Sequence, residues 1–199
     1  MQEHTTKQKI TQTMFQLIAE KGYDKASIGQ IAAAIGIQKA SVYYYFTSKE
    51  DIFLQMVKEL YGNDDWDKET VLKEEITVSA YRQELISAGE RFIDSYFENQ
   101  SMRKVYAEID IQATRIPALQ AFVKAMDEKF NQFLTQSMAH GVTIGAFSAD
   151  FDIKLHAQVL YTILIGIDQA ILYDLQIEPK AVWRTSVLAL FDRNEREAQ

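Results

Sequence analysis

The sequence predicts an all-α protein of about nine helices, and three observations support this prediction. Only two prolines and eight glycines occur in 199 residues, which favours long helices over the many turns of a β-sheet protein. Apolar residues recur at helical spacing through most of the chain, and no alternating strand pattern is present. Hydrophobic residues make up 47% of the chain, enough for one large or two small domains with a sizeable core.

Composition narrows the class of protein further. No cysteine is present, which excludes disulfides and thiolate metal sites. The first nine residues, MQEHTTKQK, are polar and lack the apolar core of a signal peptide, so we expect a cytoplasmic protein. The net charge is −7, but residues 1–62 carry seven lysines and six carboxylates, a local charge of +1. Because this local charge is small, we expect that charge alone does not hold an anionic partner on residues 1–62.

The N-terminal segment predicts three helices before residue 47. Apolar residues at i, i+4, i+7 and i+8 from Ile10 predict a helix over 7–21, which Gly22 ends. Residues 27–46, SIGQIAAAIGIQKASVYYYF, then predict two short helices with a turn at Gly36. Ser27 stands where a hydroxyl caps the first of them. Two helices this short persist only when they pack on neighbours.

The outward face of the second short helix is polar in an unusual way. Amide, ammonium, hydroxyl and phenol groups lie close together there, and such groups bond phosphate oxygens and base edges. An alternative is a buried helical hairpin with incidental tyrosines. The residues that supply these groups are Gln38, Lys39, Ser41, Tyr43, Tyr44 and Tyr45.

The remaining helices are predicted from apolar residues at helical spacing and from the glycines, prolines and polar segments that interrupt them. Residues 62–75 are acidic and aperiodic, which predicts a domain boundary. The segment 159–167 is apolar nearly all round, so its helix must be covered on more than one side. A membrane span is the competing interpretation, which His156, Gln158 and Asp168 argue against by interrupting the apolar run. The predicted helices are 48–61, 76–99, 101–114, 117–140, 151–175 and one that starts at Pro179.

Residues 27–46 resemble the helix-turn-helix of the TetR family of bacterial transcription regulators. The matching residues are Ile31-Ala32, Gly36-Ile37, the run from Ser41 to Phe46, and Ser48-Lys49-Glu50. The resemblance implies a DNA-binding domain at 1–62 and a ligand-binding and dimerisation domain at 63–199. It also implies a repressor that binds a palindromic DNA operator as a homodimer in the bacterial cytoplasm and is released by a small, mostly apolar effector. A co-activator that acts through a protein partner is the alternative.

The resemblance also assigns DNA contacts residue by residue. Gln38 and Lys39 are placed for adenine and guanine edges, and Ala40 for a thymine methyl. Tyr43, Tyr45 and Lys49 are expected at phosphates. The full expected set is Ser27, Gln38, Lys39, Ala40, Ser41, Tyr43, Tyr44, Tyr45 and Lys49.

The second domain yields two further sets, each with core packing as its alternative. Aromatic and aliphatic residues on the middle helices are expected to line an effector pocket: Phe92, Tyr96, Tyr106, Ile109, Phe122, Met126, Phe130, Phe133, Tyr161 and Leu164. Glu108, Asp110, Asp168 and Gln169 are polar exceptions on those helices, placed either to orient a cationic group or to face solvent. The resemblance implies that the last two helices pair across a two-fold axis through Val159, Ile163, Ile167, Ile171, Trp183, Val187 and Phe191.

The sequence contains no motif that predicts catalysis. It has no nucleophile elbow, no phosphate-binding loop and no metal-ligand spacing. The three histidines, His4, His140 and His156, are isolated in the sequence, which favours solvated or core roles over metal binding. We therefore expect no enzymatic activity, no cofactor and no metal.

Overall fold

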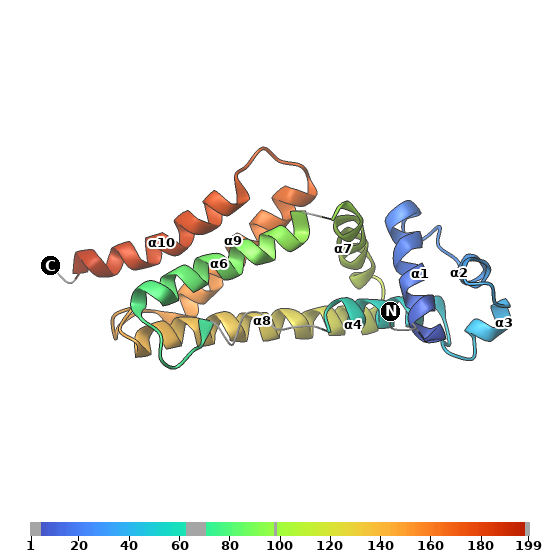
Figure 1. The fold of residues 1–199 in the computed structure, drawn as a ribbon, viewed down its shortest axis with the longest axis horizontal. Coiled ribbons are helices and arrows are strands. Elements are labelled where there is room, and N and C mark those ends of the chain that lie inside the picture. The colour runs from blue at the N-terminus through green and yellow to red at the C-terminus, as the bar shows by residue number, and fades with distance from the viewer. Residues whose placement is uncertain (1–4, 63–70, 98, 198–199) are drawn as a thin grey trace. The chain divides into compact units, whose positions relative to one another are not determined.

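The computed structural model describes residues 5–62, 71–97 and 99–197, and the side chains of 95–97 and 192–197 stand outside that description. Within this part of the chain it contains nine α-helices and no strand, which confirms the predicted fold class (Figure 1). The helices are α1 (Thr6–Lys21), α2 (Ile28–Ala34), α3 (Lys39–Val42), α4 (Lys49–Leu60), α6 (Val78–Phe97), α7 (Gln100–Ala113), α8 (Pro117–Thr143), α9 (Ile153–Leu172) and α10 (Pro179–Glu197).

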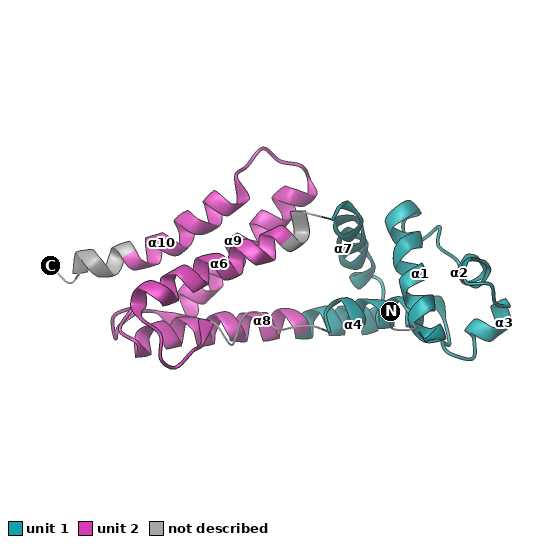
Figure 2. Ribbon diagram, viewed as in Figure 1, with its two compact units in different colours: residues 1–64, 99–125 teal, residues 65–98, 126–199 magenta. Residues whose placement is uncertain are grey.

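The chain forms two compact units whose division differs from the expected boundary at residue 62. Unit 1 comprises Met1–Asp64 together with Asn99–Ala125, and unit 2 comprises Asp65–Glu98 with Met126–Gln199 (Figure 2). Helix α7 and the start of α8 belong to unit 1 because their apolar residues Val105, Ile109 and Leu119 are buried in its core. Residues 99–125 add four basic and two acidic side chains, so unit 1 is more basic than residues 1–62 alone.

Unit 1 is built around helix α1, which packs against α2, α4 and α7. Ile10, Met14 and Ile18 are fully or almost fully buried on its inner face. The Thr11 hydroxyl donates a 2.6 Å hydrogen bond to the Glu59 carboxylate and so ties α1 to α4. Helix α1 starts with a capping box in which Thr5 and Gln8 satisfy each other's backbone amides.

Unit 2 has a larger core, in which α6, α9 and α10 pack on one another. Trp183 of α10 is 2% exposed, and its indole N–H donates to the backbone carbonyl of Ile86 at 3.0 Å. The ring lies directly over Gly89 of α6, where a side chain would collide with it. Half-exposed ion pairs, Lys180–Asp94 and Arg184–Glu90, join the same two helices and add little to stability.

Helix α9 is the one helix, among the described residues, that is long and apolar enough to cross a membrane when judged by length and composition alone. It packs against both α6 and α10 and buries Leu160, Leu164 and Ile167 between them. This arrangement is that of a core helix covered on two sides. Three of its other apolar residues, Leu155, Val159 and Ile165, are exposed in the single chain.

The close approach of Trp183 to Gly89 generates a stability prediction. A Cβ atom at Gly89 would lie 2.0 Å from Trp183 Cε2, so Gly89→Ala must displace the ring and its hydrogen bond. We expect a loss of about 1–3 kcal/mol in the free energy of unfolding, measured by urea denaturation with circular dichroism. The control, Gly29→Ala on the open side of α2, meets only the Ser27 hydroxyl at 4.0 Å. Equal stability of the two variants would contradict the packing described.

Candidate nucleic-acid interface and ligand groove

The turn between α2 and α3 is set by local backbone geometry. Gly36 has φ 72°, the left-handed region that glycine tolerates best, and it ends α2. The Ile37 amide then donates to the Ala32 carbonyl at 3.0 Å and closes the turn. Helix α3 that follows is only four residues long, shorter than the predicted segment up to Phe46, because Tyr43–Tyr45 form a turn instead.

The buried side of this segment holds α3 in place. Val42 is fully buried and Phe46 is 3% exposed, so both belong to the core of unit 1. The Phe46 amide donates to the Val42 carbonyl at 3.1 Å, which extends helical hydrogen bonding past the end of α3. A four-residue helix has no stability of its own, so these two side chains fix its orientation.

The opposite side of the segment presents the polar groups that the sequence singled out. Gln38, Lys39, Ala40 and Ser41 are all exposed, and no side chain caps the start of α3. The exposed fractions of the tyrosines are 50% for Tyr43, 85% for Tyr44 and 39% for Tyr45. The Tyr44 and Tyr45 rings meet edge to face, 5.1 Å between centroids. Side chains that can bond phosphates and bases therefore lie on one accessible surface.

Ser27 has a structural role at this site. Its hydroxyl accepts a hydrogen bond from the Gln30 amide at 3.3 Å, and the Gln30 side chain accepts from the Ser27 amide at 3.0 Å. This reciprocal pair is a capping box. The oxygen expected at a phosphate is thus already engaged in holding the start of α2.

Lys49 opens α4 and is only partly exposed. Its ammonium nitrogen lies 4.0 Å from the centroid of the Tyr23 ring, a cation–π contact. Burial lowers the pKa of Lys49, and the carboxylates of Asp24, Glu50 and Glu108 offset part of that shift. Burial also raises the pKa of the Tyr23 hydroxyl, which has no hydrogen-bond partner in the structure. The lysine expected at a phosphate is therefore held against a ring and surrounded by acidic groups.

The residues expected to line an effector pocket are divided between the cores of the two units. Tyr106, Ile109 and Phe122 pack in the core of unit 1, with the helix-turn-helix. The core of unit 2 contains Phe92, Phe130, Phe133, Tyr161 and Leu164. Met126 is buried at the point where α8 enters unit 2. The Tyr96 side chain is outside the described residues. Within unit 2, Phe130 stacks on Phe92 at 5.9 Å and contacts Phe133 and Tyr161.

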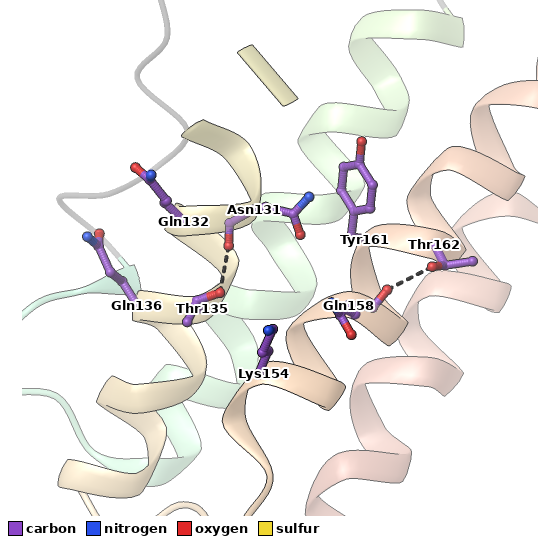
Figure 3. A pocket seen from close by; sticks show the side chains of 8 residues that line it. All are labelled: Asn131, Gln132, Thr135, Gln136, Lys154, Gln158, Tyr161 and Thr162. Atoms are coloured by element: carbon purple, nitrogen blue, oxygen red, sulfur yellow. Dashed lines mark hydrogen bonds between the residues drawn. The ribbon is translucent and has the colours of Figure 1, made fainter. Parts of the chain in front are cut away.

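A groove of about 700 Å³ lies between α8 and α9 of unit 2 (Figure 3). Amide and hydroxyl side chains dominate it, together with one ammonium group. The lining residues are Asn131, Gln132, Thr135, Gln136, Lys154, Gln158, Tyr161 and Thr162. Sequence reasoning identified only Tyr161. The sequence does contain a signal for the groove, namely polar residues at i, i+4 spacing on both helices. They are Asn131 and Thr135, Gln132 and Gln136 on α8, and Lys154, Gln158 and Thr162 on α9.

Tyr161 connects this groove with the aromatic cluster formed by Phe92, Phe130 and Phe133. Its ring centroid lies 6.2 Å from that of Phe130, while its hydroxyl hydrogen-bonds the Asp127 side chain. Burial raises the pKa of Asp127, and the hydrogen bond from Tyr161 opposes that shift. The groove therefore has a polar lining with one aromatic residue, Tyr161, which separates it from the aromatic core cluster.

Most of the residues expected at a dimer interface are buried within the single chain. Ile167, Ile171, Trp183, Val187 and Phe191 belong to the core of unit 2, since their inward-facing positions cover α6 and each other. Ile163 is partly buried, and Val159 is 42% exposed. The apolar surface left free on the last two helices consists of Leu155, Val159, Ile165 and Val182.

Metal-binding groups are not clustered in the described part of the chain, where no three His, Cys, Asp or Glu side chains gather. His156 stacks on Phe151 at 4.1 Å, and His140 meets the Tyr81 ring edge to face at 5.8 Å. Both imidazoles thus take part in aromatic packing.

The site resembles one family of known proteins. Residues 10–56 match the family model described as bacterial regulatory proteins, tetR family. The negative transcriptional regulator IcaR of the biofilm operon icaADBC in Staphylococcus aureus is 46% identical over 52 residues. That match covers 26% of this chain and 28% of IcaR, so the chain matches well under a third of this relative's length.

Solved structures match nearly the whole chain, at low identity. A TetR-family regulator from Mesorhizobium loti superposes with a TM-score of 0.77 and 23% identity, covering 96% of this chain and 98% of the other. The regulator FadR from Bacillus subtilis, in complex with stearoyl-CoA, gives 0.70 and 20% identity, covering 92% and 96%. These likenesses show that the fold extends through both units.

The capping role of Ser27 can be separated from DNA contact. Ser27→Ala removes the acceptor for the Gln30 amide, so we expect a loss of about 0.5–2 kcal/mol in the free energy of unfolding. Ser27→Asp keeps an acceptor at the same position and should stay close to the wild type. Ser41→Ala, on exposed α3, is the control. Denaturant unfolding measures all three, and equal losses in the Ala and Asp variants would exclude capping.

Proposed function

We propose that the chain is a repressor of the TetR family of bacterial transcription regulators. In this proposal it binds a palindromic DNA operator as a homodimer in the bacterial cytoplasm and is released by a small-molecule effector. The observation that carries the proposal is the exposed polar surface of α3 and Tyr43–Tyr45, on a segment whose other side is locked by Val42 and Phe46. The relatives reported above are regulators, which supports a role without catalysis.

Base reading is assigned to the start of α3. Gln38 and Lys39 are exposed and carry the amide and ammonium groups that suit adenine and guanine edges in the major groove. The Ala40 methyl is placed for a thymine methyl, and Ser41 for either a base or a phosphate. Tyr43 and Tyr45 contribute phenol groups at the flank, where phosphates lie, and Tyr44 lies against sugar or base. Lys49 is the phosphate contact from the start of α4.

Dimerisation is assigned to the exposed apolar surface of α9 and α10, defined by Leu155, Val159, Ile165 and Val182. A two-fold interface uses the same surface on both copies, so one patch suffices to make the dimer. Two reading helices related in this way contact half-sites about 34–36 Å apart, one turn of B-DNA. Doubling the contacts also compensates for the modest positive charge of the reading unit.

The effector site is assigned to unit 2, at the groove between α8 and α9 and the aromatic cluster beside it. Tyr161 lines the groove and packs on Phe130 of the aromatic cluster, and Lys154, Asn131 and Gln158 offer polar groups. We propose an effector whose larger part is apolar and which carries a polar head group. The stearoyl-CoA bound to B. subtilis FadR has this amphipathic character, which supports the proposal by analogy.

The two lysines at the proposed interface have different expected effects. Lys39→Ala removes a base contact, so it should relax base preference at one position by about 1–3 kcal/mol. Lys49→Ala removes a phosphate contact, so it should weaken binding to all duplexes alike and reduce the salt slope by about 1 per half-site. Fluorescence anisotropy measures both effects with a duplex enriched from random-sequence DNA by the wild-type protein, and with its single-base variants.

Lys58→Ala, an exposed change in the last turn of α4, is the control for these two variants. If the folded wild-type protein enriches no duplex at all, the proposed function is wrong. If Lys39→Ala leaves base preference unchanged, only the assignment of base reading is lost.

The dimer assignment makes a separate prediction. Val159→Asp places a charge in the proposed interface, on a side chain that is 42% exposed in the single chain, so each subunit should still fold. We expect a monomer by sedimentation analysis and a loss of operator binding. Ile111→Asp, at a 47% exposed position on α7, is the matched control and should remain dimeric. A dimeric Val159→Asp protein would place the interface elsewhere.

A further inference from the structure

The position of the Lys49 ammonium group is fixed by the end of helix α1. Gly22 is the C-cap of α1, with φ 82°, and the sharp turn there delivers Tyr23 into the core of unit 1. The Tyr23 ring packs on Phe53 of α4 at 4.8 Å and receives the Lys49 ammonium at 4.0 Å. The lysine therefore does not extend freely into solvent, as most surface lysines do.

A carboxylate from another part of the sequence reaches the same place. Glu108 lies on α7, which Val105 and Ile109 anchor in the core of unit 1. One of its oxygens accepts a hydrogen bond from the side chain of Gln112 at 3.5 Å. The other, Oε1, lies so close to Gly22 that a Cβ there would be 2.7 Å away. Glu108 is thus beside the residue that precedes the ring under Lys49.

This location is unfavourable for a carboxylate unless a cation is near. Gly22 stands at the C-terminal end of α1, where the helix dipole is negative and the last carbonyls offer no donor. The cation of this neighbourhood is Lys49: burial lowers its pKa, and the carboxylates of Asp24, Glu50 and Glu108 oppose that shift. The other two carboxylates have additional partners, since Asp24 lies 4.0 Å from Arg115 and the N-terminal end of α4 stabilises Glu50.

We propose that Glu108 is a positioning residue that holds the Lys49 ammonium group on the Tyr23 ring and opposes its contact with a DNA phosphate. This inference rests on the proposed DNA-binding function. It assigns to α7 a direct influence on DNA affinity, exerted through charge within unit 1. Glu108 opposes phosphate binding in either position of Lys49. If Lys49 stays on the ring, the phosphate must approach the Glu108 carboxylate. If Lys49 swings outward, its attraction to Glu108 must be overcome.

The sign of the effect follows from Coulomb's law. Neutralising Glu108 removes repulsion of the phosphate and frees Lys49, so DNA binding becomes tighter. Glu108→Gln keeps the size of the side chain and an acceptor for Gln112. For a charge at this range near a protein surface we expect the dissociation constant to fall by about threefold to tenfold at low salt. The gain should shrink as salt rises, because screening weakens the interaction.

A double-mutant cycle tests this proposal. Wild type, Glu108→Gln, Lys49→Met and the double variant are compared by fluorescence anisotropy with the duplex enriched by the wild-type protein, over a salt series. Glu108→Gln should tighten binding in the wild-type background, and most of the gain should disappear in the Lys49→Met background. Asp110→Asn removes the same charge from an exposed position two residues along α7 and should give a smaller gain that does not depend on Lys49.

The outcomes separate this inference from the proposed function. A wild-type protein that binds DNA, with a Glu108→Gln variant that binds equally or more weakly, overturns the inference alone. A gain that is the same with and without Lys49, or the same in Asp110→Asn, also overturns it, because the effect is then general charge. Thermal unfolding of each variant identifies a purely structural change, which would alter stability without altering the salt dependence of binding.

Discussion

The burial of Val42 and Phe46 in the core of unit 1 is the constraint on which the exposed polar surface of α3 depends. Helix α3 has four residues, too few for a stable helix, and no side-chain hydrogen bond caps it. Its orientation therefore comes from the two apolar side chains that flank its C-terminal end. Once they are buried, helical periodicity leaves Gln38, Lys39, Ser41 and the tyrosines outside. Recognition chemistry and core packing are thus two sides of one short segment.

Charge in this unit is arranged around a few contacts. Residues 1–62 are nearly neutral, and α7 with the start of α8 adds basic side chains while also bringing the Glu108 carboxylate beside Gly22. A regulator benefits from moderate affinity, because a protein that binds every phosphate strongly discriminates poorly between sequences. In the proposed arrangement, the Glu108 carboxylate would lower the sequence-independent part of the affinity and leave the proposed base contacts on α3 unchanged.

Unit 2 shows how one set of aromatic residues divides between packing and a candidate ligand site. Trp183 fills the space that Gly89 leaves open and fixes α10 on α6. Phe92 and Phe130 pack in the core, and Tyr161 links them to the polar groove between α8 and α9. The apolar residues that remain exposed on α9 and α10 are those assigned to the proposed dimer interface.

The sequence alone determined the helical fold, the helix-turn-helix at 27–46 and its exposed polar groups, because these depend on local periodicity, caps and glycine positions. Only the tertiary structure decided which inward-facing side chains share a core. It moved Tyr106, Ile109 and Phe122 into unit 1 and buried Trp183, Val187 and Phe191 inside a single chain. An apolar stripe predicts that a helix face is buried, but it does not identify the element that packs against that face. Likewise, the packing of the Tyr23 ring against Phe53 and the Lys49 ammonium group joins residues far apart in the chain, and no local pattern encodes such a contact.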